Sequence, residues 1–283
     1  MFDKKELSLV TLLKVFRWKV GLTWLLTILE TGLMALIPLF IGLAIDGLMT
    51  RTFEPLYMLC GVLAALLVVA TGRRVYDTRA YGTIRVALTA EMANRNSTLK
   101  ISSLSARVHM ARELVDFLEG ELPAIMTSVL QLVVAVGVLA YFNWVLAASA
   151  LTAGGLMLVI YGLFHRRFFR LNRALNAQSE KEVSLLERRD PPIFLKHLRS
   201  LRRFDVQLSD TEAAVYGMIF ALLLSVVIFN LGYTALVMAA SAGAVFAIVT
   251  YSWDFVDGAV SVPMALQSWS RLSEIIERIN KTT

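Results

Sequence analysis

Two long stretches of the sequence contain no Asp, Glu, Lys or Arg, and they restrict the possible folds more than any other feature. They cover residues 122–164 and 213–253. Each is about twice the ~20 apolar residues that a helix needs to cross a bilayer, and so is long enough for a helical hairpin. Only 18% of the 283 residues are charged, against about a quarter in soluble domains. The sequence therefore predicts an all-α, polytopic membrane protein.

Apolar segments separated by turn signals define the predicted domain organisation. Residues 1–19 form an amphipathic segment, which is expected to lie at the membrane surface as an elbow. Residues 20–283 form the predicted transmembrane domain, in which the long loops 74–121 and 165–212 are expected to prolong the spans as paired helices. We expect Pro191 and Pro192 to break the second pair. Six spans are predicted, over residues 20–47, 56–73, 122–141, 144–164, 213–232 and 242–266.

Basic residues are distributed very unevenly between the connections. There are 5 in residues 1–19, 8 in residues 73–112, 11 in residues 166–203 and 3 after residue 270, which leaves only Arg51 elsewhere. Cytoplasmic loops carry an excess of Lys and Arg, so both termini and both long loops are predicted to be cytoplasmic. The net charge of +6 is then a signal of topology, and no nucleic-acid partner is expected. The predicted location is a cell membrane, with a bacterial inner membrane as the expected type.

Metal and disulfide chemistry are not supported by the composition. Cys60 is the only cysteine, and the three histidines, at positions 109, 165 and 197, are isolated from one another. A thiolate zinc site or an intramolecular disulfide needs at least two cysteines. We expect no metal site.

Several short patterns resemble the transmembrane domain of ABC exporters in their order and spacing. They are Pro38, Gly42 and Asp46 at the end of the first span, residues 112–125, residues 185–196, Ala242 to Phe246, Pro263, residues 270–272 and residues 277–279. This resemblance covers nearly the whole chain. It implies a six-helix fold that forms a domain-swapped homodimer, with the first and sixth helices of both protomers around a central cavity.

The resemblance also implies two cytoplasmic turns that dock on an ATPase. The matching positions include Ser105 and Arg107 in the first loop and Pro191 and Lys196 in the second. Here the sequence departs from the family pattern, because the first turn lacks aromatic residues and Pro191 replaces a glycine. A standard ATPase partner is therefore less strongly indicated.

The 283 residues contain no G-x-x-x-x-G-K-[ST] motif, which nucleotide-binding loops of ATPases require. The chain is expected to be neither an enzyme nor the holder of a cofactor, and ATP would act only through a separate ATPase subunit. Three explanations stay open. The ATPase is a separate chain, the fold is driven by another energy source, or the natural chain continues beyond Thr283.

Acidic residues inside the predicted spans are the main candidates for function, because a charged side chain is costly in a bilayer. Glu30 lies in the first span, and Asp254 and Asp257 lie in the last. No Lys or Arg lies in the interior of a predicted span to pair with them, since Arg73 is the last residue of its span. Asp46, near the outer end of the first span, is instead expected to cap or anchor a helix.

The last predicted helix carries Thr250, Asp254, Asp257 and Ser261 within one narrow arc, since each residue of a helix advances by about 100°. A carboxyl group in a low-dielectric site is protonated more easily than in water. The arc is therefore a candidate site for protons or for a cationic substrate. The alternative is that these carboxylates only fix the register of the helices through hydrogen bonds.

Three aromatic residues, Tyr251, Trp253 and Phe229, are candidates for the lining of a substrate cavity. Such residues more often serve interior packing or contact with lipid.

Three functions remain consistent with the sequence. The first is a homodimeric transporter that works by alternating access and couples to protons or ions through its carboxylates, as peptide importers that reuse this fold do. The second is the permease subunit of an ABC exporter whose ATPase is a separate chain. The third is a membrane scaffold or sensor that kept the fold. Acidic groups favour a cation or a cationic peptide as the cargo.

Overall fold

The computed structural model describes residues 13–95, 101–187 and 190–281. Every element in these ranges is helical, which confirms the predicted all-α class. In chain order the elements are α2 (Arg17–Met49), α3 (Glu54–Arg95), α4 (Ile101–Asp116), the π-helical segment η1 (Phe117–Glu121), α5 (Leu122–Phe142), α6 (Trp144–Ser179), α7 (Glu182–Glu187), α8 (Pro191–Leu236) and α9 (Ala242–Lys281). Most of the predicted elbow, residues 1–12, lies outside the described ranges.

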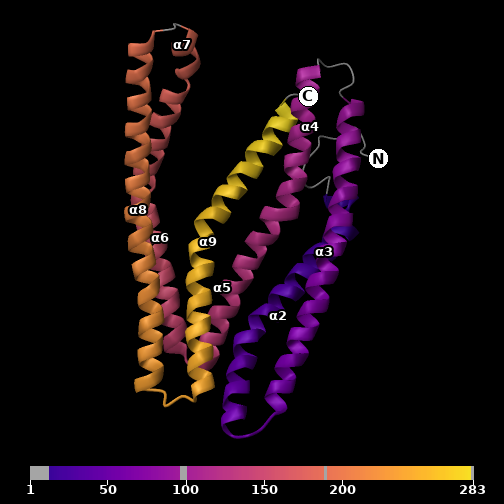
Figure 1. The fold of residues 1–283 in the computed structure, drawn as a ribbon, viewed down its shortest axis with the longest axis vertical. Helices are drawn as coiled ribbons and strands as arrows, with labels where there is room; N and C mark the ends of the chain where they lie inside the picture. Colours follow the sequence, from indigo (N-terminus) through magenta and orange to yellow (C-terminus); the bar gives the residue numbers. More distant parts are fainter. Residues whose placement is uncertain (1–12, 96–100, 188–189, 282–283) are drawn as a thin grey trace.

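The described residues contain 6 helices that are long and apolar enough to cross a membrane, as predicted. The turns that follow α2, α5 and α8 lie together at one end of the molecule, whereas α7 and the start of α4 lie at the other end (Figure 1). The short connections and the long basic connections are thus separated in space. This is the separation that the predicted membrane orientation requires.

Four of the helices are much longer than a bilayer. Helix α3 has 42 residues and α8 has 46, so each measures about 60–70 Å at a rise of 1.5 Å per residue. The hydrocarbon core of a bilayer is only about 30 Å thick. Helices α6 and α8 pack against each other and separate from the other helices towards α7 (Figure 1). Each of these two helices is thus longer than the part of it that a bilayer would cover.

Local sequence explains where these helices begin. The Asp190 carboxylate accepts a hydrogen bond from the Ile193 amide at 3.2 Å, and Pro191 occupies the first turn of α8, where its missing N–H costs nothing. The Asn143 side chain caps α6 in the same way. Pro191 thus ends the connection after α6 and also starts α8, the second helix of the α6–α8 pair.

The third span is one continuous helix that widens in the middle. Helix α4 passes through η1 into α5 without a break. Pro123 lies in the first turn of α5 and has no N–H to donate to the carbonyl group four residues earlier. A local π-helical segment accommodates this loss of a regular hydrogen bond.

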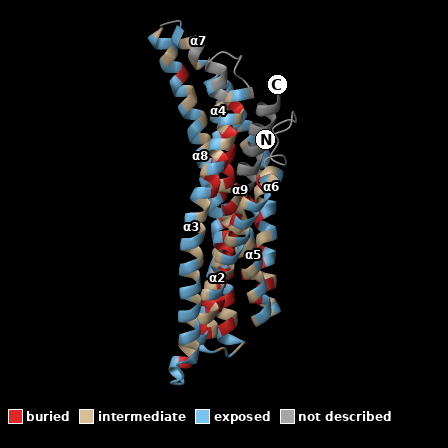
Figure 2. Ribbon diagram, turned by 90° about the vertical axis from the view of Figure 1, so that its right-hand side faces the viewer, coloured by how far each residue is buried: buried red, intermediate tan, exposed pale blue. Residues whose placement is uncertain are grey.

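Buried apolar side chains form two separate clusters. One contains residues of α5, α6, α8 and α9, and the other contains Phe16 with residues of α2, α3, α4 and η1. Buried residues follow the inner faces of the helices, while the outer faces are largely exposed (Figure 2). Since α2 also packs against both α5 and α9, the seam between the two clusters lies where these three helices meet.

The backbones of α2 and α9 touch where Gly42 meets Gly243. A Cβ atom on Gly42 would lie 2.5 Å from the Gly243 carbonyl oxygen. Only glycine allows such an approach. Both glycines belong to the patterns that resemble ABC exporters, so their role in this chain is to let the first and last spans cross closely.

Candidate functional site

Asp46 holds the start of α9 rather than forming part of a polar site. Its Oδ1 accepts a hydrogen bond from the Gly243 amide at 2.8 Å, and its Oδ2 accepts one from the Ser241 hydroxyl at 2.5 Å. The Ser241 oxygen in turn accepts a hydrogen bond from the Ala244 amide at 3.2 Å. These bonds satisfy free amides of a helix N-terminus. The predicted anchoring role of Asp46 is confirmed.

A small internal cavity lies at the seam between the two apolar clusters, where α2, α5 and α9 meet. Its volume is about 130 Å³. The lining residues are Thr31, Met34 and Ala35 of α2, Thr127, Gln131, Val134 and Ala135 of α5, and Tyr251 and Asp254 of α9. Asp254 is the only ionisable carboxyl group in this lining.

The polar groups of the cavity are held in place by hydrogen bonds between helices. The hydroxyl oxygens of Thr31 and Thr127 are 3.2 Å apart. The Tyr251 hydroxyl donates to the Ala35 carbonyl oxygen at 2.6 Å, and Tyr251 is fully buried. Gln131 interacts with the Asp254 carboxylate. Because three helices contribute these groups, the shape of the cavity depends on how those helices pack.

The cavity suits small polar species only. Sites for drug-sized ligands usually measure about 300–1,000 Å³, whereas this cavity measures about 130 Å³. Its polar side chains carry one carboxylate, two aliphatic hydroxyls, the Tyr251 phenol and an amide. No Lys or Arg of the described residues forms a salt bridge with Asp254. Such oxygen-rich groups can hold a proton, water molecules or a small hard cation.

Comparison with known protein families agrees with this architecture. The chain matches the model of the ABC transporter transmembrane region over residues 9–243. It belongs to that family. A search of the curated proteins finds no match.

The residues that match the family model include only some of the residues that line the cavity. Residues 9–243 of this ABC transporter transmembrane region include α2, α5 and the close contact between Gly42 and Gly243. Asp254 lies after the matched residues, on α9. The walls of the cavity contributed by α2 and α5 therefore fall in the shared part of the chain, while its carboxylate does not.

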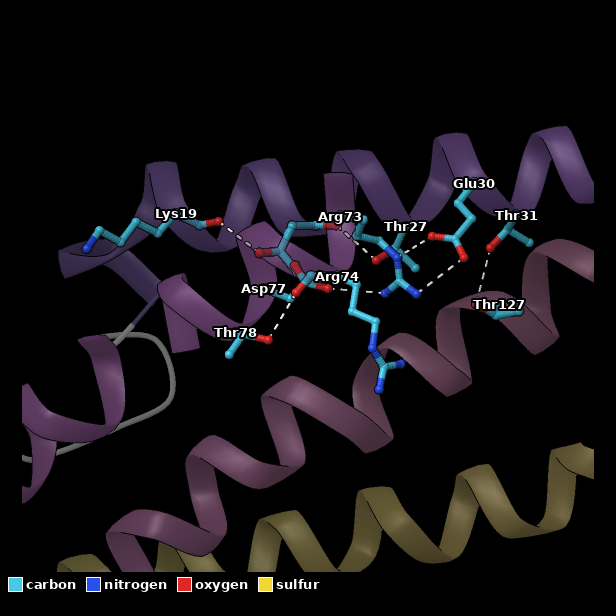
Figure 3. Close-up of polar contacts among 10 residues, drawn as sticks. Lys19, Thr27, Glu30, Thr31, Arg73, Arg74, Asp77, Thr78 and Thr127 are labelled. Atoms are coloured by element: carbon cyan, nitrogen blue, oxygen red, sulfur yellow. Dashed lines mark hydrogen bonds and ion pairs between the residues drawn. The ribbon is translucent and has the colours of Figure 1, made fainter. Parts of the chain in front are cut away.

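Glu30 was expected to have no basic partner, and that expectation is wrong. The Arg73 guanidinium of α3 forms an ion pair with the Glu30 carboxylate and contacts Asp77 at 3.2 Å. Figure 3 shows Arg73 between the two acids, with the Thr31–Thr127 pair beside Glu30. Arg73 was counted with the basic loop because it ends an apolar segment. Its long side chain reaches Glu30 on α2. This pairing depends on how α2 and α3 pack, which the sequence does not show.

The four residues of the polar arc on α9 have different surroundings in the structure. Asp254 lines the cavity, but Asp257, one turn further on, is exposed. The hydroxyl groups of Thr250 and Ser261 donate to carbonyl oxygens of their own helix, at 2.9 Å in both cases. Neither these two residues nor Asp257 lines the cavity, so Asp254 is the one member of the arc that this cavity uses.

The aromatic candidates also differ from one another. Tyr251 lines the cavity and is buried. Trp253 and Phe229 are about half exposed, and Phe229 stacks on Tyr233 with ring centroids 6.0 Å apart. Neither of the exposed rings lines the cavity, which leaves Tyr251 as the aromatic residue of this site.

The expected docking positions lie far from the cavity along the chain. Ser105 is exposed on α4, and Pro191 and Lys196 are exposed at the start of α8. The side chain of Arg107 lies outside the described residues. Exposure of the three described residues is compatible with a docking role, which stays a prediction.

Sequence reasoning missed Gln131 and Thr127, because both lie in a stretch chosen for its lack of charge. Gln131 is the only amide side chain within α5. A lone amide in a membrane span is itself a signal, since its hydrogen-bonding groups need partners away from lipid. That signal would have pointed to α5 as the third wall of the site.

Proposed function

We propose that this protein is a membrane transporter driven by an ion gradient, in which Asp254 takes up and releases a proton or a small cation. Membership of the ABC transporter transmembrane region family supports a role in membrane transport. The single observation behind the finer proposal is the half-buried Asp254 carboxylate, which lines a small cavity within the helix bundle and forms no salt bridge with a basic residue of the described ranges. A carboxyl group in such a place changes its charge when a cation or proton binds, and this change alters the packing of three spans.

The transport cycle that we propose is alternating access in a homodimer. The pair α6–α8 separates from the remaining helices towards α7 (Figure 1), and large apolar side chains such as Phe169, Val206 and Tyr216 are exposed on it. A second protomer would cover such surfaces. The helices would then move as rigid groups about a site within the membrane, with both termini in the cytoplasm and the cargo in a larger space between protomers.

Proteoliposomes test this proposal. The purified protein would be reconstituted with a pH-sensitive dye inside, and the uptake of ethidium or of a fluorescent basic peptide would be followed with and without an imposed pH gradient. Gradient-driven uptake with simultaneous proton movement is the expected result. The variant Asp254→Asn should lose this coupling, while Asp257→Asn, an exposed carboxylate on the same helix, serves as the matched control and should retain most of it.

The family match also favours a second candidate, the permease subunit of an ABC exporter with a separate ATPase chain. This candidate predicts that uptake ignores the pH gradient and requires ATP and an added ATPase, and that an ATPase co-purifies from native membranes. If neither condition produces uptake, the protein is a scaffold or sensor that keeps the fold. In all three cases we expect no ATPase activity from this chain alone.

A further inference from the structure

A second concave surface lies at the start of α2, far along that helix from the cavity at Asp254. It has a volume of about 700 Å³. Its lining residues are Arg17, Trp18, Lys19, Gly21, Leu22 and Leu25 of α2 and Tyr76 of α3. We refer to this surface as the α2 groove. It shares no residue with the cavity at Asp254.

The end of the α2 groove nearest the start of α2 is cationic. Arg17 and Lys19 line it, and no acidic residue does. Neither residue takes part in a salt bridge of the described residues. The Arg17 guanidinium lies 5.6 Å from the centre of the Trp18 ring, a cation–π contact that holds the charge beside the groove. Two positive charges in a lining that contains no acidic residue form a site for an anion.

The other end of the α2 groove, further along α2, is apolar and open. Leu22 and Leu25 are 41% and 60% exposed, although leucine side chains in water are normally buried. Trp18, Leu22 and Leu25 are spaced by four and three residues, so they share one face of the helix. Gly21 beside them has no atoms within 4 Å of a Cβ position, which leaves this face unobstructed. The groove thus passes within two turns of α2 from Arg17 and Lys19, which flank Trp18 on either side, to the apolar side chains of Leu22 and Leu25.

The depth of the α2 groove in the membrane follows from the rest of α2. Exposed large apolar residues continue along this helix from Leu22 as far as Met49, and Lys19 is the first basic residue before them. Trp and Tyr concentrate at the level of lipid headgroups, so Trp18 and Tyr76 are expected at that level. The Tyr76 hydroxyl donates to the Lys19 carbonyl oxygen at 3.5 Å and so joins α3 to this level. The groove crosses the boundary between headgroups and acyl chains.

We propose that the α2 groove binds one anionic phospholipid. The phosphate lies between Arg17 and Lys19, and an acyl chain lies along Leu22 and Leu25. A free phosphate would use only the cationic part, whereas a zwitterionic lipid would bring its own positive headgroup close to two cations. The pattern of charge and hydrocarbon therefore fits a lipid with a net negative headgroup, drawn from the leaflet on the basic side of the protein.

Native mass spectrometry and lipid exchange on the purified full chain test this proposal. The protein in detergent would be titrated with phosphatidylglycerol and, separately, with phosphatidylcholine. We expect one phosphatidylglycerol molecule to be retained at much lower concentration than phosphatidylcholine. In Arg17→Gln/Lys19→Gln this preference should fall about thirtyfold, because each basic residue close to an anionic headgroup contributes roughly a fivefold factor.

The double variant Arg74→Gln/Arg79→Gln is the matched control. Both residues are exposed on α3 and neither lines the α2 groove, so the same loss of charge should leave the preference within about twofold. Thermal unfolding of both double variants shows whether they are folded. Leu22→Ser/Leu25→Ser provides a second probe, because it should weaken retention of long-chain but not of short-chain phosphatidylglycerol.

Several results would overturn the proposal. Equal retention of both lipids, or an equal loss in the two charge variants, would mean nonspecific attraction to the basic side of the protein. Displacement of the lipid by glycerol phosphate at similar concentration would mean a site for a soluble phosphate. Retention that increases when residues 1–12 are deleted would mean that the groove belongs to the chain's own N-terminal segment. Lipid binding requires no ion gradient, so Asp254→Asn should retain it even if the proposed transport function is wrong.

Discussion

Gly42 and Gly243 meet so closely that a Cβ atom on Gly243 would lie 1.9 Å from the Gly42 carbonyl oxygen. The contact joins α2 and α9, the first and last spans, next to the hydrogen bonds that Asp46 makes with Ser241 and Gly243. Close backbone approach and side-chain anchoring thus fix the same crossing. The crossing in turn sets the distance between the two helices that line the cavity with α5.

The variant Gly243→Ala should lower the free energy of unfolding by about 3 kcal/mol, because relief of the clash requires the two backbones to separate. Thermal unfolding in detergent measures the change. Gly137→Ala is the control, since a Cβ there meets no atom within 4 Å and a helical alanine should be neutral or stabilise by up to about 1 kcal/mol. Equal effects of the two variants would contradict the close crossing.

The ion pair between Arg73 and Glu30 should be visible in a double-mutant cycle. Arg73→Gln leaves Glu30 and Asp77 without their shared partner in a largely buried place, and should cost about 2–3 kcal/mol. Glu30→Gln should be less harmful because Arg73 keeps Asp77. In the double variant Glu30→Gln/Arg73→Gln the loss should be smaller than the sum of the single losses. Additive losses would mean that the two side chains do not interact.

The variant Asp254→Asn tests whether the Asp254 carboxylate has a functional or a structural role. A half-buried carboxylate that no basic residue of the described ranges pairs with is not optimised for stability, so its neutral isostere should raise the free energy of unfolding by about 1 kcal/mol while it abolishes coupled transport. Asp257→Asn should change stability by less than about 0.5 kcal/mol, because that side chain is exposed. Clear destabilisation by Asp254→Asn would indicate that Asp254 only holds the helices together.

Asn230 should be important for the packing of α6, α8 and α9. Its Oδ1 accepts a hydrogen bond from Ser149 at 2.7 Å, and its Nδ2 donates to Ser252 at 2.8 Å. Asn230→Ala leaves two hydroxyls without this partner in a buried place and should cost about 1–3 kcal/mol. Thermal unfolding measures the loss. Ser225→Ala on the exposed side of α8 is the comparison and should have little effect.

Some residues of the candidate site could be predicted from the sequence and others could not, for a physical reason. Asp254 was found because charged residues are rare and costly in an apolar span, and Tyr251 was found only as one of three aromatic candidates. Gln131 and Arg73 were missed, because their roles depend on which helix faces which. The partner of Glu30 lies 43 residues away along the chain, and no local pattern specifies such a pairing.

The sequence by itself determined the six spans, the separation of short from basic connections and the family pattern. These are local properties, because the bilayer selects any apolar segment of sufficient length whatever its neighbours are. Only the tertiary structure decided that Asp254, but not Asp257, lines a cavity, that Glu30 is paired and that Gly42 touches Gly243. These relationships depend on the rotation and crossing of helices, which are set by contacts between residues far apart in the chain.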